Sequence, residues 1–409
     1  MLATHELPAY SPLSARHLIV AAGRRAARGG VLLDEACQLL SRGFGADDVM
    51  LVDSGRSALQ LAIALSLPER GDRVVAIPAF QCFEVASAAV GTGCRIAPYD
   101  VDPETLQPRL DSLEQALADG ATSIVIAPLY GLPVAWSPIE TLAARHGAIL
   151  VEDAAQSHGA AWAGRPVGTF GALSVLSFGR GKGWTGGGGG ALLIRSTALA
   201  ERARAISVAP ASGRTELRTA ATSFLQLLFG RPHLYGIPAS VPRLGLGETR
   251  YHHPSPPAAA HPYSLALLME TRAASLREAE VRRRNAFDWS EALPPAIMSG
   301  VPRVVPEGVC GYLRYPVCLP ESAVAEASAD IARRAGIARS YPLTLAELPA
   351  VMPRLLAPAR AYPGAHTLSR RVVTLPTHSR LTRAARDAIL ALATSWVRTP
   401  LRTRRETPV

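Results

Sequence analysis

The only lysine of the chain, Lys182, lies in the glycine-rich stretch SFGRGKGWTGGGGG, residues 177–190. Of the 43 Lys and Arg residues, this one is lysine and the other 42 are arginine. A surface charge tolerates the exchange of lysine for arginine, whereas a site that must release its proton does not, because a guanidinium stays protonated in proteins. A lysine in a glycine-rich loop is usually only a solvated charge, so the surrounding residues must decide its role.

One hypothesis for Lys182 is phosphate binding in a loop of the type G-x-x-x-x-G-K-[ST]. Leu176 occupies the position of the required first glycine, and Gly183 stands where Ser or Thr would bind magnesium. The five glycines at 186–190 lead into an apolar strand-like run rather than a helix, which also excludes a dinucleotide-binding fingerprint. The sequence therefore argues against a nucleotide phosphate loop.

A second hypothesis is a Schiff base between the Lys182 amine and an aldehyde, a bond that arginine does not form. Pyridoxal phosphate is the cofactor that lysine holds in this way, and a carboxylate pairs with its ring nitrogen. The cofactor also needs an anion site for its phosphate and a backbone that approaches it without a side-chain clash. The glycines around Lys182 meet the last of these requirements.

Three further features of the sequence provide the anion site and the carboxylate that the cofactor needs. Residues 54–57, Ser-Gly-Arg-Ser, follow an apolar run and begin a predicted helix, whose first amides form an anion site. Asp153 and Ser177 each end an apolar run, and α/β folds bind ligands at such strand ends. Taken alone, residues 54–57 are more often a plain helix cap, and Asp153 is equally explained as the cap of the next helix. Their coincidence with the sole lysine favours a pyridoxal phosphate site.

The elements that must position these residues are those of an α/β domain. Short apolar runs typical of strands cover residues 73–78, 94–100, 122–130, 148–153, 173–178 and 190–196. They are continuous rather than alternating, as in strands that are covered on both faces. Helix-length segments lie between them, for example residues 57–67 and 137–147. This alternation predicts a layered α/β domain.

The pattern changes beyond residue 196. Residues 222–249 are apolar but interrupted by Pro and Gly, and residues 252–262 form a Pro-rich connector. A long helix is predicted over about 264–288, and it is followed by an apolar segment at 312–319, helices near 322–335 and 382–396, and a strand at 371–376. We predict a large domain over residues 1–255, with an extended insertion at 197–260, and a smaller α+β domain over 256–409 with a basic tail that we expect to be disordered.

Composition narrows the function classes. The net charge is +10, but the arginines are scattered and no aromatic residues interleave with them, so we expect no nucleic-acid binding. The five cysteines show no metal-ligand spacing, so we expect no metal site. The chain has no signal-peptide pattern and no apolar run of transmembrane length, and we predict a reduced, cytoplasmic protein.

In their order along the chain, these motifs resemble the DegT/DnrJ/EryC1/StrS family of pyridoxal-phosphate sugar aminotransferases. The motifs that carry the resemblance are SGRSAL (54–59), PAFQCF (78–83), DVDPETL (100–106), LYG (129–131), EDAAQSHGA (152–160), GRPVGTFG (164–171), SFGRGK (177–182) and LPTHSRLT (375–382). The resemblance is close over residues 45–195 and loose over residues 264–396. Its most specific part is the pair EDAAQ and S-F-x-x-x-K.

The resemblance implies fold type I of the pyridoxal-phosphate transferases, with a large mixed-sheet α/β/α domain, a smaller C-terminal α+β domain and a homodimer whose active sites lie at the interface. It implies that Lys182 forms the Schiff base and that Asp153 pairs with the ring nitrogen, both as catalytic residues. It also implies that Gln156 contacts the region of the cofactor ring.

The remaining cofactor-binding residues follow from the same resemblance. Ser177 and the amides of Gly55 and Arg56 are expected to hold the phosphate. Phe83, or its neighbour Cys82, takes the position of the aromatic residue that stacks on the ring. Arg56 replaces the family's threonine, and the family's G-x-N-Y-R segment is not recognisable before residues 263–272.

The implied reaction is a ping-pong transamination from an amino acid, with glutamate expected, to a keto sugar, with a nucleotide-linked one expected, in polysaccharide, glycolipid or secondary-metabolite biosynthesis. Two alternatives stay open. One is an enzyme of this family with a non-sugar or lipid-linked substrate. The other is a non-catalytic sensor or structural protein on the same fold, against which the intact pair of Lys182 and Asp153 argues.

The apolar residues of the segment 222–249 predict an interface. They either pack into the dimer or against the catalytic domain, or they make a peripheral membrane contact helped by Arg231 and Arg243.

Overall fold

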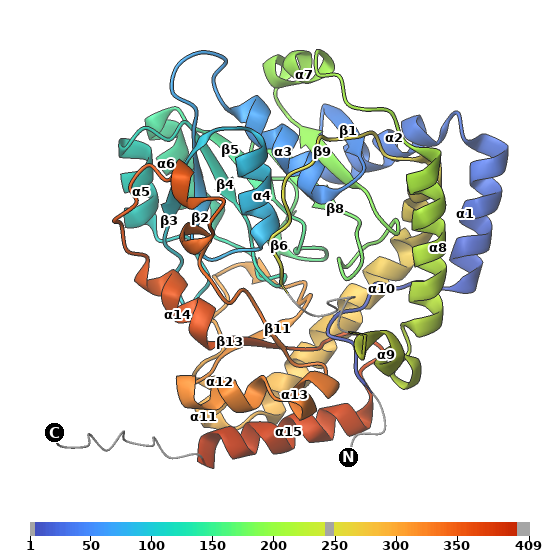
Figure 1. Cartoon of the computed structure of the whole chain (residues 1–409), viewed down its shortest axis with the longest axis vertical. Helices are drawn as coiled ribbons and strands as arrows, with labels where there is room; N and C mark the ends of the chain where they lie inside the picture. The colour runs from blue at the N-terminus through green and yellow to red at the C-terminus, as the bar shows by residue number, and fades with distance from the viewer. Residues whose placement is uncertain (1–4, 242–248, 399–409) are drawn as a thin grey trace.

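A seven-stranded mixed sheet forms the centre of the larger part of the molecule (Figure 1). The computed structural model describes residues 5–241 and 249–398 of the chain. The strands of this sheet are β1 (Asp48–Val52), β2 (Val74–Pro78), β3 (Arg95–Tyr99), β4 (Ser123–Ile126), β5 (Ile149–Asp153), β8 (Leu173–Ser177) and β9 (Gly190–Ile194). They lie side by side in the order β1-β9-β8-β5-β4-β2-β3.

The strands from β8 to β3 in this order run parallel, whereas β9 is antiparallel to both β8 and β1. The six predicted strands are confirmed, although β4 is shorter than residues 122–130 because the chain leaves the sheet after Ile126 and turns at Tyr130, whose φ is +57°. The carboxyl ends of parallel strands share one edge of a sheet. This arrangement brings Asp153, at the end of β5, and Ser177, at the end of β8, to the same edge.

Helices cover both faces of the sheet. One face carries α3 (Gly55–Ser66), α4 (Phe83–Gly91) and α7 (Thr197–Arg204), and the other carries α5 (Leu110–Ala118) and α6 (Trp136–His146). Val75 and Ile77 of β2 pack in the first of these two cores, and the alternate residues Val74 and Ala76 pack in the second. Burial on both faces explains the continuous apolar runs of the sequence. The predicted α/β/α layering is confirmed.

A group of long helices extends the second layer over β8, β9 and β1 (Figure 1). It consists of α1 (Ala15–Arg28), α2 (Leu32–Phe44), α8 (Gly213–Phe229) and the first half of α10 (Pro262–Ala292). The far end of α10 reaches the second sheet, where Trp289 is fully buried. α10 therefore joins the two cores, and the predicted division at residues 255 and 256 stays a prediction.

The second sheet is antiparallel and has the order β11-β13-β12. Its strands are β11 (Tyr315–Cys318), β12 (Ala338–Arg339) and β13 (Val372–Leu375), and its core is closed by α11 (Pro295–Met298), α12 (Glu321–Ala327), α13 (Asp330–Arg334) and α15 (Arg383–Arg398). α14 (Pro363–Arg371) turns toward the large sheet and packs in its first core. The smaller α+β unit is thus confirmed. A third small sheet is formed by β6 (Ala161–Trp162), β7 (Arg165–Pro166) and β10 (Gly308–Val309).

In the described part of the insertion predicted at 197–260, residues 197–241 and 249–260, the chain forms the three helices α7, α8 and α9 (Pro232–Ala239). α8 packs against α1 and α10 on one side, and its other side is exposed. Arg243, named above for the membrane contact, and the tail after residue 398 lie outside the described residues. Among the helices within residues 5–241 and 249–398, none is both long enough and apolar enough to cross a membrane.

Candidate active site

The first residue of α3, Gly55, packs directly against the last residue of β8, Ser177. Ser54 caps this helix, and its Oγ accepts a hydrogen bond of 3.1 Å from the backbone N–H of Ser57. A Cβ at Gly55 would lie 2.6 Å from the Cβ of Ser177, and one at Gly190 would lie 2.5 Å from the carbonyl of Ser54. Two glycines without side chains are therefore what allows the helix to begin this close to β8 and β9.

The loop that carries Lys182 connects β8 to β9. Gly181 has a φ of +72°, a conformation that favours glycine, and its N–H donates to Ser11 Oγ at 3.0 Å. A Cβ at Gly183 would lie only 2.7 Å from His158 Cβ. The glycines on either side of Lys182 thus let the loop turn and pack tightly while the lysine side chain is directed into the site.

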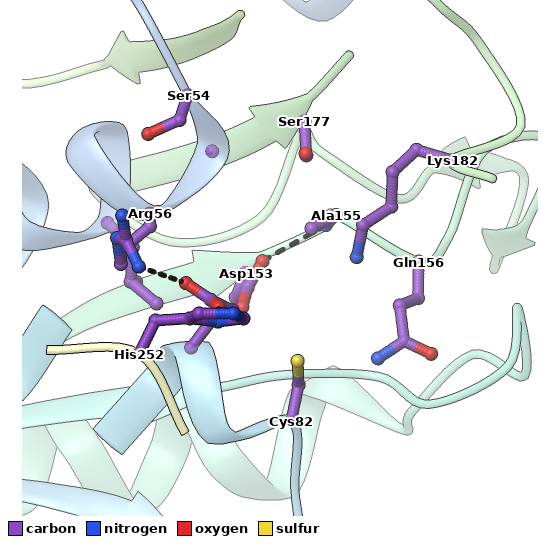
Figure 2. A pocket seen from close by; sticks show the side chains of 12 residues that line it. Ser54, Arg56, Cys82, Asp153, Ala155, Gln156, Ser177, Lys182 and His252 are labelled. Carbon is purple, nitrogen blue, oxygen red and sulfur yellow. Dashed lines mark hydrogen bonds and ion pairs between the residues drawn. The ribbon is translucent and has the colours of Figure 1, made fainter. Parts of the chain in front are cut away.

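Six of the seven predicted site residues line one cavity of about 370 Å³ (Figure 2). These are Gly55, Arg56, Asp153, Gln156, Ser177 and Lys182. Figure 2 shows Lys182 reaching from its loop toward the space that Asp153 and Gln156 also face. The fold therefore brings together residues from the start of α3, the ends of β5 and β8 and the loop after β8.

Asp153 carries the negative charge of the cavity floor. Its Oδ1 accepts a hydrogen bond of 3.0 Å from the Ala155 N–H, which fixes the carboxyl group at the end of β5. Burial raises the pKa of Asp153, and the nearby positive charge of Lys182 opposes this effect. The carboxylate and the amine are thus close enough to influence each other across the cavity.

The preceding residue, Glu152, points to the opposite face of β5 and has a structural role. Its carboxyl group is fully buried and accepts hydrogen bonds from the N–H groups of Gly168 and Phe170 and from the hydroxyl of Ser174, at 2.7–2.8 Å. Burial raises its pKa to about 7. Glu152 of the motif EDAAQ thus accepts hydrogen bonds from backbone N–H groups of the motif GRPVGTFG, and this contact fixes the turn that the second motif forms.

Gln156 is held by two residues that the sequence analysis did not assign to the site. Its Oε1 accepts a hydrogen bond of 3.3 Å from the backbone N–H of Tyr130, and its Nε2 donates to the hydroxyl of Tyr341 at 2.9 Å. Tyr341 comes from the segment that follows β12. No local sequence signal marks it, because it meets Gln156 only through the packing of the two sheets.

The structure corrects the placement of Phe83. Cys82 lines the cavity, whereas the Phe83 ring is buried in the core beside Tyr341, with the ring centroids 6.1 Å apart. Phe83 begins α4 and is directed into the helix–sheet core, and the preceding residue is left at the cavity wall. Burial raises the pKa of the Cys82 thiol, so it stays neutral near pH 7.

The mouth of the cavity holds a chain of charged groups. Glu84 binds the guanidinium of Arg56 at 3.0 Å and the Nδ1 of His252 at 2.8 Å, and Arg56 also reaches Ser255 Oγ at 3.4 Å. Glu84 and His252 line the cavity and were not predicted. His252 belongs to the Pro-rich connector, whose distance in sequence from α3 gave no signal for this contact.

A second cavity of about 280 Å³ lies beside the first and shares Ala155, Ser177 and Lys182 with it. Its wall is largely apolar and includes Trp184. His158 also lines it, and burial together with the charge of Arg282 lowers the pKa of this histidine to about 4, so that its ring is neutral. Within the described residues no group of three or more His, Cys, Asp or Glu side chains is placed to hold a metal ion.

The chain is similar to known aminotransferases both in sequence and in structure. Residues 29–225 match the model of the DegT/DnrJ/EryC1/StrS aminotransferase family. An L-glutamine:2-deoxy-scyllo-inosose aminotransferase of Streptomyces kanamyceticus is 35% identical over 172 residues, which are 40% of each protein. A dTDP-3-amino-3,4,6-trideoxy-alpha-D-glucose transaminase of Streptomyces venezuelae is 37% identical over 161 residues, 39% of this chain and 42% of the relative.

The chain thus matches only about two fifths of the length of these two relatives. The whole fold is similar to that of an aminotransferase from Streptoalloteichus hindustanus, with a TM-score of 0.74 and 20% identity over 96% of this chain and 99% of that one. The sequence match covers the part that contains Gly55, Asp153 and Lys182, and the structural match extends over both sheets. Over residues 29–225 the chain is therefore similar to the DegT/DnrJ/EryC1/StrS aminotransferase family, and its fold is similar to that of a solved aminotransferase.

Proposed function

We propose that this protein is a pyridoxal-phosphate-dependent aminotransferase that moves an amino group from an amino acid to the ketone of a polyhydroxylated ring. The observation that carries the proposal is the position of the sole lysine. Lys182 shares one cavity with the carboxylate of Asp153 and with the amino end of α3. An amine, a carboxylate and an anion site are the three groups that this cofactor requires.

The residues present fit the cofactor. The first N–H groups of a helix have no intrahelical acceptor, and Gly55 and Arg56 contribute theirs at the cavity wall. The missing side chain at Gly55 lets the start of α3 contact Ser177, so that the helix amides and the Ser177 hydroxyl lie on one side of the cavity. When bound, pyridoxal phosphate supplies an aldehyde for covalent attachment and a ring that withdraws electrons from the substrate carbon.

Each residue then has a definite task. The amides of Gly55 and Arg56 and the hydroxyl of Ser177 bind the phosphate group. The Asp153 carboxylate would hold a proton on the ring nitrogen of the bound cofactor. The Lys182 amine removes and returns the proton at the reacting carbon of the substrate, a role that typically accelerates a reaction by about 10²–10⁴-fold.

The acceptor is proposed from the relatives. One relative is named for an inosose, a cyclic polyhydroxy ketone, and the other for a dTDP-linked amino sugar. We propose a cyclic polyhydroxy ketone as the acceptor. The nucleotide-linked keto sugar expected from the sequence is a member of this class whose ring also carries a nucleoside diphosphate. We propose glutamate or glutamine as the donor. We also propose a cytoplasmic homodimer, as the family resemblance implies.

The test compares the purified wild type with variants that replace Lys182 or place the only lysine at position 180. The wild type should bind pyridoxal phosphate with a visible absorption band, lose the band with L-glutamate or L-glutamine, and regain it with an accepted ketone. Lys182→Arg should keep the charge and abolish both half-reactions. The variant Arg180→Lys/Lys182→Arg retains a single lysine two positions earlier and should be equally inactive, whereas Arg180→Lys alone should react normally. Normal transamination by Lys182→Arg would disprove the proposal.

A further inference from the structure

Tyr341 reaches the active site from the second sheet without lining the cavity. It follows β12 in the chain, and its hydroxyl oxygen accepts the hydrogen bond of 2.9 Å from Gln156 Nε2. A few residues later, the Leu345 N–H donates to the carbonyl of Ala79 at 2.7 Å, which ties this segment to the loop after β2. Tyr341 is therefore a fixed link between the second sheet and the wall of the cavity.

The ring of Tyr341 is held between two aromatic side chains. The Phe80 ring meets it edge-on at 5.5 Å, and the Phe83 ring is tilted against it at 6.1 Å. Such contacts define the position of a ring well, because aromatic pairs prefer these geometries. Phe83, which the sequence analysis expected against the cofactor, thus has its contact with Tyr341 instead.

The amide of Gln156 has opposite partners at its two ends. The Tyr130 N–H only donates, so it must face Oε1, at 3.3 Å. Tyr341 accepts from Nε2, and Gln81 Oε1 lies 3.5 Å from the same nitrogen. Gln81 is itself fixed, because its Nε2 donates to the Ala127 carbonyl at 2.6 Å. The orientation of the Gln156 amide is therefore determined by hydrogen bonds to residues that do not line the cavity.

We propose that Tyr341 is a positioning residue that holds the Gln156 amide against the cofactor ring and so makes cofactor binding depend on the second sheet. The inference rests on the proposed function, since it requires that pyridoxal phosphate occupies the cavity. Burial raises the pKa of the Tyr341 phenol well above its ordinary value, so the hydroxyl stays neutral and available to the amide.

The test is Tyr341→Phe, which keeps the ring between Phe80 and Phe83 and removes only the hydroxyl. Equilibrium dialysis of pyridoxal phosphate should give a dissociation constant about 3–10-fold higher than that of the wild type, as expected for one lost hydrogen bond. The absorption maximum of the bound cofactor should shift as well, because the amide beside the ring is no longer fixed. Tyr362→Phe is the matched control, because its buried hydroxyl has no hydrogen-bond partner among the described residues.

A double-mutant cycle separates positioning from a general structural role. In a Gln156→Ala background, Tyr341→Phe should change neither the dissociation constant nor the spectrum further. Additive effects of the two substitutions, or an unchanged constant in Tyr341→Phe while the wild type binds the cofactor, would overturn the inference and leave the proposed function standing. A wild type that binds no pyridoxal phosphate would overturn both.

Discussion

Gly55, the first residue of α3, lies in direct contact with Ser177, the last residue of β8. A Cβ at Gly55 would come within 2.6 Å of the Ser177 Cβ and within 2.7 Å of its Oγ. Contacts under 3 Å are shorter than packing permits, so a side chain at Gly55 would push the helix away from the strand. The amides of the helix and the hydroxyl of Ser177 share one side of the cavity because of this contact.

The first prediction follows from this contact. Gly55→Ala should displace the start of α3 and raise the dissociation constant for pyridoxal phosphate by at least about 10-fold, at a cost of about 1–3 kcal/mol in unfolding free energy. Dialysis with the cofactor and thermal unfolding of the apo protein measure the two effects. Gly23→Ala is the control, because a Cβ at Gly23 meets nothing within 4 Å. Unchanged cofactor affinity in Gly55→Ala would show that the phosphate binds elsewhere.

The second prediction concerns Asp153. Asp153→Asn keeps an oxygen for the Ala155 N–H but removes the charge that faces Lys182 and that we propose to pair with the ring nitrogen of the cofactor. Hydrogen bonds to charged groups contribute about 1.5–3 kcal/mol, so cofactor affinity should fall by about 10–100-fold and the half-reaction with glutamate should slow. Stopped-flow absorbance measures this rate, with the exposed Asp72→Asn as control. A half-reaction at the wild-type rate in Asp153→Asn would place the ring nitrogen away from β5.

Much of the site was predictable because its residues sit at the ends of sequence-local elements. Asp153 and Ser177 end apolar runs that can only be buried strands, and the position of the ends of parallel strands follows from the fold class. The glycines near Lys182 and at Gly55 show in the sequence, but their reason, close approach of backbone to side chains, appears only in the structure.

The rest of the site depends on contacts between distant segments. Glu84 and His252 meet at the cavity because the Pro-rich connector passes the start of α4. Tyr341 meets Gln156 because the second sheet packs near the first. Phe83 was misplaced for a related reason. In a turn that leads into a helix, a shift of one residue decides which side chain faces the cavity and which faces the core, and the sequence does not fix that shift.

The helices α8 and α9 were also missed, for a different physical reason. Pro and Gly interrupt the apolar pattern of residues 222–249, which reads as irregular chain. In the structure, Gly230 caps the end of α8 and Pro232 begins α9. These residues therefore mark the boundary between two helices and do not interrupt either helix.

The third prediction is a pH dependence of stability. Burial, with the charges of nearby arginines such as Arg282, lowers the pKa of His378 to about 4, and its Nε2 lies 2.8 Å from the Leu7 carbonyl. The ring is neutral in the folded protein, whereas in the unfolded chain it gains a proton near its ordinary pKa of 6.5. Stability from this group is therefore complete above about pH 6.5 and is lost as the pH falls toward 4, by about 2 kcal/mol at pH 5.

His378→Gln tests this prediction, because an amide still donates to the Leu7 carbonyl and does not titrate. Urea unfolding at pH 7.5 and pH 5 should show a smaller loss of stability for the variant than for the wild type. The exposed His253→Gln should behave like the wild type. Equal losses for wild type and His378→Gln would mean that His378 is protonated in the folded protein or accessible to water.

The last prediction concerns the exposed side of α8, a part of the insertion for which the sequence analysis left two interpretations. Four large apolar side chains of this helix are more than two fifths exposed and lie at helical spacing along one side: Leu217, Phe224, Leu225 and Leu228. Arg214 and Arg218 on the same helix and Arg231 at the start of α9 are exposed too. The acidic residue of α8, Glu216, is bound by Arg25.

This combination favours a lipid surface over a second copy of the chain. In a symmetric dimer the same patch meets itself, which would bring arginines together without free carboxylates on α8 to pair with them. An anionic membrane supplies the opposite charge and accepts the apolar side chains at its surface. We therefore predict reversible binding of the full chain to vesicles that contain anionic lipid, weakening as the salt concentration rises.

Co-sedimentation with phosphatidylserine vesicles at low salt measures this binding. Phe224→Ser/Leu228→Ser should shift the protein to the supernatant without changing the half-reaction with glutamate, because neither residue lines the active-site cavity. Phe287→Ser, which removes an exposed phenylalanine from α10 outside this patch, should sediment like the wild type. A wild type that stays in the supernatant would disprove the membrane contact, and loss of the dimer in Phe224→Ser/Leu228→Ser would assign the face to the dimer instead.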